Sequence, residues 1–199
     1  MRALYVLAHG AGAGMRHAFM EDISRVLAER GIGTFRYQFP YTEEGRRAPD
    51  PAPRLEKTVR AAVAEAARLA PGAPLIAGGK SMGGRMTSRA QSAEALPDVR
   101  GLAFLGFPLH APGREGVERA DHLAAVEIPM LFVQGTRDRL ANLELIGSVA
   151  GGLGDLATLE VIEGGDHSFA VPKKLGVSRE EVLEDVAARI AAWAGAVTR

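Results

Sequence analysis

Short apolar runs alternate with amphipathic segments along the whole chain. The apolar runs predict six buried strands, over residues 3–8, 33–39, 73–78, 101–107, 128–135 and 157–163. In the segments between them, apolar residues recur with a helical period, which predicts helices over 17–30, 54–69, from 81 onward, 142–151 and 178–196. The last helix is expected to bury Val182, Leu183, Val186, Ile190 and Trp193.

This alternation of strands and helices determines the fold class. Strands separated by helices need crossover connections, so we expect a mostly parallel sheet with helices on both faces. The continuous apolar character of the strands agrees with a sheet that is covered on both sides. The chain has no internal repeat, low-complexity tract or linker, which predicts a single domain over residues 1–199. In such a sheet the functional site lies beyond the carboxyl ends of the strands.

The bulk composition excludes several classes of site and partner. Lys plus Arg and Asp plus Glu both total 24, so the zero net charge gives no attraction to nucleic acid or anionic membranes. The chain has no cysteine, hence no disulfide and no thiolate metal site. The apolar run at 3–8 is shorter than that of a signal peptide, and no segment could span a bilayer. We expect a cytoplasmic protein without metal or cofactor, whose partner is a small-molecule substrate.

The segment LIAGGKSMGGRM, residues 75–86, contains Gly-Lys-Ser and therefore resembles a phosphate-binding loop. That loop needs a glycine six residues before the lysine, where this chain has Pro74, and residues 75–77 belong to a strand. A second glycine-rich turn, HGAGAG, resembles a dinucleotide-binding loop, but the third glycine of that pattern is replaced by Met15. Neither nucleotide-binding motif is therefore complete.

The same segment also contains the nucleophile-elbow pattern Gly-x-Ser-x-Gly, over residues 79–83. It follows a predicted strand and begins a helix, which is the context that this motif requires. The glycines avoid collisions in a tight turn that exposes Ser81 as a nucleophile. The alternative is a glycine-rich turn whose serine only caps the helix. The pentapeptide alone does not distinguish a nucleophile elbow from a helix cap. The choice depends on whether the chain also provides a base and an acid for the serine.

A serine hydroxyl needs a positioned base, and this motif predicts the chain order serine, acid, histidine. Of the five histidines, only His167 follows the last two predicted strands, in the turn EGGDHSF. Asp138 follows the fifth strand in VQGTRDRL and is the predicted acid, which would orient the imidazole. Asp166 is the competing acid, but a residue adjacent to His167 would reach its ring nitrogen with difficulty.

Catalysis by a serine also needs donors for an oxyanion. One predicted donor is the backbone N–H of Met82, which follows Ser81 at a helix N-terminus. The other is expected from the loop HGAGAG, from the N–H of Ala11 or, as its substitute, of Gly12. Loss of one such donor typically raises the barrier by about 3–4 kcal/mol.

Together, HGAGAG, GGKSMGGRM, GTRD and GGDHSF resemble the alpha/beta-hydrolase superfamily over essentially the whole chain. The chain is most similar to the compact, dienelactone-hydrolase-like branch and to a group of small proteins with the Gly-Lys-Ser-Met-Gly-Gly elbow. This resemblance implies the strand order 2-1-3-4-5-6, without the first antiparallel hairpin of the full fold. Dienelactone hydrolases carry cysteine where this chain has Ser81, so their lactone substrate is not carried over.

The expected activity is hydrolysis of a small or soluble ester, thioester or lactone by Ser81, Asp138 and His167. Only about twenty residues separate the fourth and fifth strands, which is too few for the helical lid of a lipase. The cations nearest the predicted rim, Arg46, Arg47 and Lys80, could hold a substrate carboxylate or phosphate. The alternatives are that Arg46 and Arg47 lie on a solvated loop and that Lys80 is turned away and bonds to backbone. Acyl transfer and peptide cleavage use the same triad. A binding or scaffold role is a further alternative, because some relatives of the small group are regulatory subunits of chromatin complexes.

Overall fold

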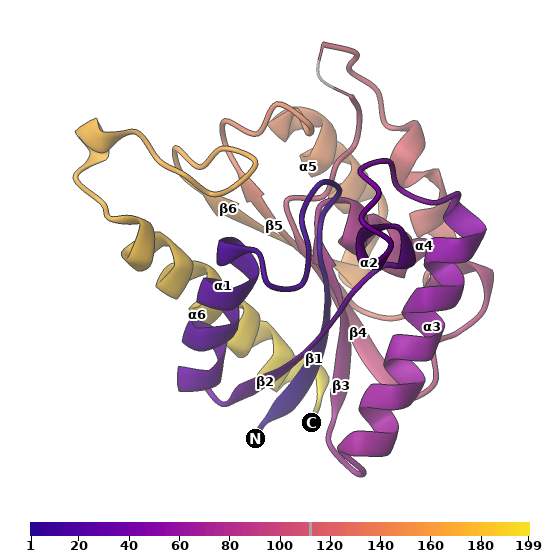
Figure 1. Ribbon diagram of the computed structural model, residues 1–199. Helices are drawn as coiled ribbons and strands as arrows, with labels where there is room; N and C mark the ends of the chain where they lie inside the picture. Colours follow the sequence, from indigo (N-terminus) through magenta and orange to yellow (C-terminus); the bar gives the residue numbers. More distant parts are fainter. Residues whose placement is uncertain (112) are drawn as a thin grey trace.

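A six-stranded parallel sheet forms the centre of the molecule (Figure 1). The computed structural model describes residues 1–111 and 113–199. The strands are β1 (Ala3–Ala8), β2 (Ile32–Tyr37), β3 (Leu75–Lys80), β4 (Val99–Leu105), β5 (Met130–Gly135) and β6 (Ala157–Ile162). Their order, β2-β1-β3-β4-β5-β6, confirms both the predicted fold class and the strand order. The strand boundaries differ by at most two residues from those expected.

Helices cover both faces of this sheet (Figure 1). One face is covered by α1 (Ala18–Glu29) and α6 (Arg179–Val197), and the other by α3 (Ala52–Leu69), α4 (Met82–Ala93) and α5 (Leu143–Gly152). A 3-10 helix, η1 (Glu118–Ala125), lies in the connection between β4 and β5. Three short elements were not predicted from the periodicity: α2 (Pro40–Glu43), η2 (Gly154–Leu156) and η3 (Lys173–Leu175).

Alternate residues of each strand enter two hydrophobic cores. In β1, Leu4 and Val6 pack under α3 and α4, whereas Tyr5 and Leu7 pack under α1 and α6. The apolar faces of α1, α3 and α6 are buried as the periodicity indicates, except at Trp193, whereas α5 buries only Ile146 and Ala150. Trp193 is only partly buried, because its indole lies against the edge of the core, over Gly101, where a Cβ would approach the ring to 2.7 Å.

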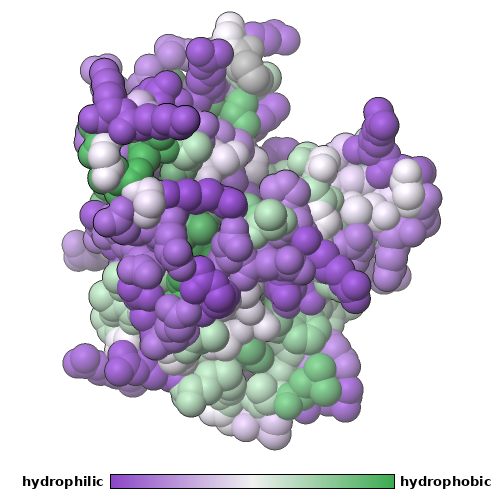
Figure 2. Space-filling view, turned by 60° about the vertical axis from the view of Figure 1, so that its left-hand side comes forward, coloured by the Kyte–Doolittle hydropathy of each residue, from purple (hydrophilic) through white to green (hydrophobic). Residues whose placement is uncertain are grey.

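In Figure 2, hydrophilic residues dominate the upper and middle parts of the surface, and mostly weakly hydrophobic residues gather over its lower part. Exposed apolar residues are normal on a folded protein. Over residues 1–111 and 113–199, no helix combines the length and the hydrophobicity that a transmembrane segment needs.

Candidate active site

Ser81 lies in a sharp turn between β3 and α4, at the carboxyl end of the sheet. Its backbone has φ 52° and ψ −119°, a strained conformation for a residue with a side chain. The flanking glycines are required by close approach of the backbone. A Cβ on Gly79 would lie 2.2 Å from the carbonyl oxygen of Ala8, and one on Gly83 would lie 2.6 Å from that of His9. This is the geometry of a nucleophile elbow, and it favours that interpretation over a simple helix cap.

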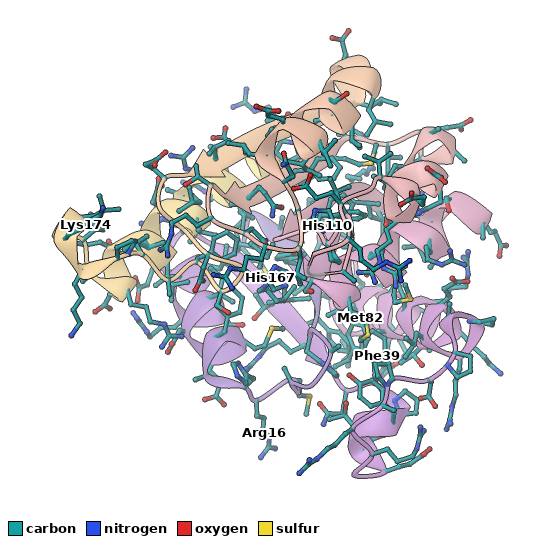
Figure 3. The ribbon with its side chains drawn as sticks, turned by 90° about the horizontal axis from the view of Figure 1, so that it is seen from above. Arg16, Phe39, Met82, His110, His167 and Lys174 are labelled. Carbon is teal, nitrogen blue, oxygen red and sulfur yellow. The ribbon has the colours of Figure 1, made fainter. Side chains whose placement is uncertain are left out.

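Three side chains form a hydrogen-bonded chain beside this turn. Oγ of Ser81 lies 2.8 Å from Nε2 of His167, and Nδ1 of His167 lies 2.7 Å from Oδ2 of Asp138. A carboxylate accepts hydrogen bonds, so Nδ1 carries the proton and Nε2 presents its lone pair to Ser81. Figure 3 looks onto this edge of the sheet and shows His167 near its middle. The structure thus brings the predicted serine, histidine and acid together from turns far apart in sequence.

Asp138 is held by two further donors and has a fully buried side chain. Nε2 of Gln134 donates to Oδ2 at 2.6 Å, and the N–H of Leu140 donates to Oδ1 at 2.8 Å. Oε1 of Gln134 also accepts from the N–H of Phe107 at 3.0 Å. Gln134 was not predicted as a site residue, although a polar side chain within the apolar strand β5 was a usable signal.

Asp166, the competing acid, bonds to the backbone of its own turn. Its Oδ1 accepts from the backbone N–H groups of Ser168, at 2.8 Å, and Ala170, at 2.9 Å. These bonds shape the turn that presents His167, whose side chain remains 26% exposed. The carboxylate at hydrogen-bonding distance from the imidazole is therefore that of Asp138, as the sequence predicts.

The predicted oxyanion donors come from the loop after β1, which carries Ala11, and from the start of α4, which carries Met82. The backbone N–H groups of Ala11 and Met82 make no hydrogen bond within the described ranges, and both residues line a cavity together with Ser81. His9 fixes this loop: Nδ1 donates to the carbonyl of Gly10 at 2.9 Å, and Nε2 accepts from the N–H of Phe39 at 3.1 Å. Burial lowers the pKa of His9, which favours the neutral ring that this pattern requires. His9 was also not predicted as a site residue.

Two cavities adjoin Ser81. The larger, about 500 Å³, lies toward α3, α4 and η1, and is mostly apolar. The smaller, about 210 Å³, lies between the loop at 10–13, His167 and the start of α1. Gly12, the alternative donor, lines the smaller cavity with Ala11. Ser81 lines both cavities, so a ligand could extend in two directions from it.

The three cations predicted at the rim occupy three different environments. Arg46 pairs with Glu44 at 2.6 Å and with Asp50 at 2.7 Å, and Arg47 is exposed; neither is among the residues that line the two cavities. Lys80 lines the smaller cavity but is 8% exposed, and its Nζ has no hydrogen-bond partner in the described structure. The structure therefore does not place Arg46 and Arg47 at the cavities.

Lys80 is buried behind the hydrogen-bonded chain. Its Nζ lies 6.0 Å and 5.9 Å from the ring centroids of Phe19 and Phe169. Burial lowers the pKa of its ammonium to about 8, an effect that the carboxylates of Asp138 and Asp166 partly oppose. The charge on Lys80 thus depends on pH near neutrality.

Elsewhere in residues 1–111 and 113–199, no cluster of three or more His, Asp or Glu side chains has the arrangement of a metal site. The hydrogen-bonded Ser81, His167 and Asp138, next to two free backbone donors, form an arrangement that can support attack by a hydroxyl with a histidine as the proton carrier.

Solved structures of several hydrolases share this fold. The chain is 18% identical to a dienelactone hydrolase from Anabaena variabilis, with a TM-score of 0.76 over 99% of this chain and 87% of that one. An alpha-beta serine hydrolase homologue from Coxiella burnetii is 18% identical, with a TM-score of 0.75 over 96% and 85% of the two chains. A serine hydrolase without a lid from Xanthomonas campestris is 19% identical, with a TM-score of 0.70 over 95% and 79%.

At these identities the structural similarity establishes the fold alone. Evidence for the family comes from the sequence: a profile of the alpha/beta hydrolase domain matches residues 1–195. That match spans both glycine-rich turns, the elbow at Ser81 and the turns that carry Asp138 and His167. Sequence profile, strand order and the geometry of the turn at Ser81 agree, and the chain therefore belongs to the alpha/beta-hydrolase superfamily.

Proposed function

We propose that this protein is a serine hydrolase that cleaves small or soluble carboxylic esters, thioesters or lactones. The observation that carries this proposal is the continuous chain from Ser81 Oγ through the His167 ring to the Asp138 carboxylate, with separations of 2.8 Å and 2.7 Å. A structural serine needs neither the positive φ of Ser81 nor an imidazole aligned by a buried carboxylate. The combination is the arrangement that activates a hydroxyl for attack.

In the first half of the reaction, Oγ of Ser81 attacks the substrate carbonyl while Nε2 of His167 takes its proton. The N–H groups of Ala11 and Met82 hold the developing oxyanion, and Asp138 stabilises the imidazolium. The bond to the leaving alcohol or thiol then breaks, and His167 returns the proton to the leaving group. An acyl group remains on Ser81.

In the second half, water attacks the acyl carbon and gives a proton to His167 by the same route. The bond between Ser81 and the acyl carbon breaks, the acid departs, and Ser81 regains its proton from His167. No oxidant, reductant or metal is consumed in either half. Binding of an acyl substrate in either cavity beside Ser81 is compatible with this sequence of steps.

The test is labelling by a fluorophosphonate probe, together with turnover of short p-nitrophenyl esters. Wild type should be labelled, and Ser81→Ala should lose the label and at least about 10³-fold in kcat/KM. Ser92→Ala is the matched control, because Ser92 lies at the other end of α4 and its hydroxyl only bonds to the carbonyl of Arg89. Equal labelling of wild type and Ser81→Ala would contradict the assignment, and a wild type that reacts with no ester would favour a binding or scaffold role.

A further inference from the structure

The larger cavity beside Ser81 contains two arginines that the proposed reaction does not use. Most of its wall is apolar, formed by residues such as Leu55 of α3 and Met86 of α4. Arg85, on the first turn of α4 after the elbow, and Arg119, on η1, line the same space. Two cations on the wall of a mostly apolar cavity are costly unless an anion lies against them.

Neither arginine has an ion-pair partner in the part of the chain that the structure describes. Within residues 1–111 and 113–199, no carboxylate forms an ion pair with Arg85 or Arg119, whereas the neighbouring Arg89 pairs with Glu56 at 2.6 Å. The Nε of Arg85 is buried without a hydrogen-bond partner. Arg119 donates from NH1 to the carbonyl of His110 at 3.1 Å, and this bond leaves its charge uncompensated.

The carboxylate of Asp50 also lines the cavity, but it already accepts hydrogen bonds from other residues. Oδ1 of Asp50 accepts from Arg46 at 2.7 Å and from Arg54 at 3.0 Å, and Oδ2 accepts from the N–H of Tyr41 at 3.0 Å. Asp50 therefore fixes the loop between β2 and α3 and is not available to Arg85 or Arg119. Burial, followed by the charges of Arg119 and Arg89, lowers the pKa of Arg85, and the charge of Glu56, which forms its ion pair with Arg89, opposes this shift only in part.

The two arginines are carried by elements that are firmly joined. Oγ of Ser88, one turn along α4 from Arg85, lies 2.7 Å from Nε2 of His122, which is on η1 like Arg119. Burial lowers the pKa of His122 to about 4, so this ring is neutral at pH 7 and the contact is a permanent hydrogen bond. The packing of α4 and η1 therefore fixes the backbone positions of Arg85 and Arg119 relative to each other.

We propose that this cavity is the acyl subsite for a substrate whose acyl chain ends in a carboxylate, which Arg85 and Arg119 bind while the reacting carbonyl lies at Ser81. The inference rests on the proposed hydrolase function and adds the substrate class: monoesters or monothioesters of short dicarboxylic acids. A guanidinium presents a planar pair of donors that matches a carboxylate, and the apolar wall between Ser81 and the arginines suits a short methylene chain.

The first experiment measures binding without turnover. In the Ser81→Ala variant, isothermal titration calorimetry compares monomethyl glutarate, which is an anion, with neutral dimethyl glutarate. The anion should bind at least about tenfold more tightly, and added NaCl should reduce this preference because it screens charge. Adding Arg85→Gln and Arg119→Gln should remove the preference. Equal affinities for the two ligands, or a preference that survives loss of both arginines, would overturn the proposal.

The second experiment measures turnover with two esters of equal chain length, mono-p-nitrophenyl glutarate and p-nitrophenyl valerate. Each single Arg→Gln variant should lower kcat/KM for the glutarate about 10-fold or more and leave that for the valerate within about twofold. The valerate activity also shows that each variant is folded. Arg89→Gln is the matched control: it removes a charge from the same helix, but Arg89 faces Glu56 and does not line the cavity.

The outcomes separate this inference from the hydrolase proposal. Charge-selective binding without Ser81-dependent turnover would support the anion site and contradict the hydrolase. Ser81-dependent turnover with equal kcat/KM for the glutarate and the valerate would support the hydrolase and contradict the anion site. If Arg89→Gln lowers glutarate turnover as much as Arg85→Gln does, a general loss of positive potential explains the effect and the subsite is wrong.

Discussion

Lys80 precedes the proposed nucleophile, and its amine is directed into the core and not into solvent. It lies near the rings of Phe19 and Phe169, and a Cβ placed on Gly106 would approach its Nζ to 3.1 Å. Within the described structure this nitrogen has no hydrogen-bond partner, and burial lowers its pKa to about 8. A buried, unpartnered ammonium is destabilising, and the cost depends on pH.

Lys80→Met should stabilise the protein at pH 7. Below pH 8 the lysine is charged in both the folded and unfolded chains, so the folded state bears the full cost of burying it. Between pH 8 and about 10.5 only the unfolded chain holds this proton, so the contribution of Lys80 to stability improves as the pH rises. We expect a gain of up to about 3 kcal/mol at pH 7 that decreases toward pH 10, measured by urea denaturation at both pH values.

Lys57→Met is the matched control, because Lys57 is exposed on α3 and the same atoms are changed. Its free energy of unfolding should change by less than about 0.5 kcal/mol, with no dependence on pH between 7 and 10. A pH-independent gain in Lys80→Met would show that the packing of the methionine, and not removal of a buried charge, accounts for the result.

Individual residues of the site were predictable to different degrees. Ser81, Asp138 and His167 could be found from sequence because each follows a strand and local glycines mark the turn. The sequence does not show which way a side chain points once a turn is packed. Lys80 was expected at the rim with Arg46, but the core around Phe19 encloses Lys80, and Glu44 and Asp50 bind Arg46.

At the scale of elements, the start of α4 lies unusually close to β1. A Cβ on Gly83 would lie 2.6 Å from the carbonyl oxygen of His9 and 2.7 Å from the Cβ of Ala8. Both neighbours are fixed, one as backbone and one as a short side chain in the central sheet. Gly83→Ala therefore requires the helix to move away from the strand, together with the turn that holds Ser81.

We expect Gly83→Ala to lower the free energy of unfolding by at least about 2 kcal/mol in chemical denaturation, despite the higher helix propensity of alanine. Gly151→Ala is the control: Gly151 lies in α5, and a Cβ there would meet no atom within 4 Å. That variant should be unchanged or more stable by up to about 1 kcal/mol. Similar effects of the two substitutions would show that close approach of α4 to β1 is not what requires Gly83.

The long elements were predictable because the period of their apolar residues follows from burial on one face. The shorter elements were not: α2 is one turn that begins at Pro40, and η3 is shorter than a helical period. The same limit explains why Arg85 and Arg119 were missed. They belong to different helices, and only the packing of η1 on α4 places both on one cavity.

At the scale of the whole molecule, strand order assembles the site. The sheet places β1 between β2 and β3, so the loop with Ala11 lies beside the elbow at Ser81. The loops after β5 and β6, which are adjacent strands, bring Asp138 and His167 together. The alternation of strands and helices predicted a parallel sheet, but the order of its strands was inferred from resemblance, because periodicity carries no information on which strands are neighbours.

The whole molecule also leaves its proposed active site open to solvent. In its described part, the connection from β4 to β5 contains only the 3-10 helix η1, and the side chain of His167 is 26% exposed. A lipase lid is a mobile helical cover whose opening at a lipid surface accelerates turnover. If the proposed hydrolase function holds, no such acceleration should occur here.

We therefore expect the rate with p-nitrophenyl butyrate to follow simple saturation through the concentration at which the ester forms a separate phase. Turnover of p-nitrophenyl palmitate should be slower per enzyme, because a cavity of about 500 Å³ with arginines on its wall suits a short chain. A lidded lipase assayed in parallel should show the rate increase at the phase boundary. A similar increase for this protein, or a preference for palmitate, would mean that part of the chain moves to form an apolar surface over Ser81.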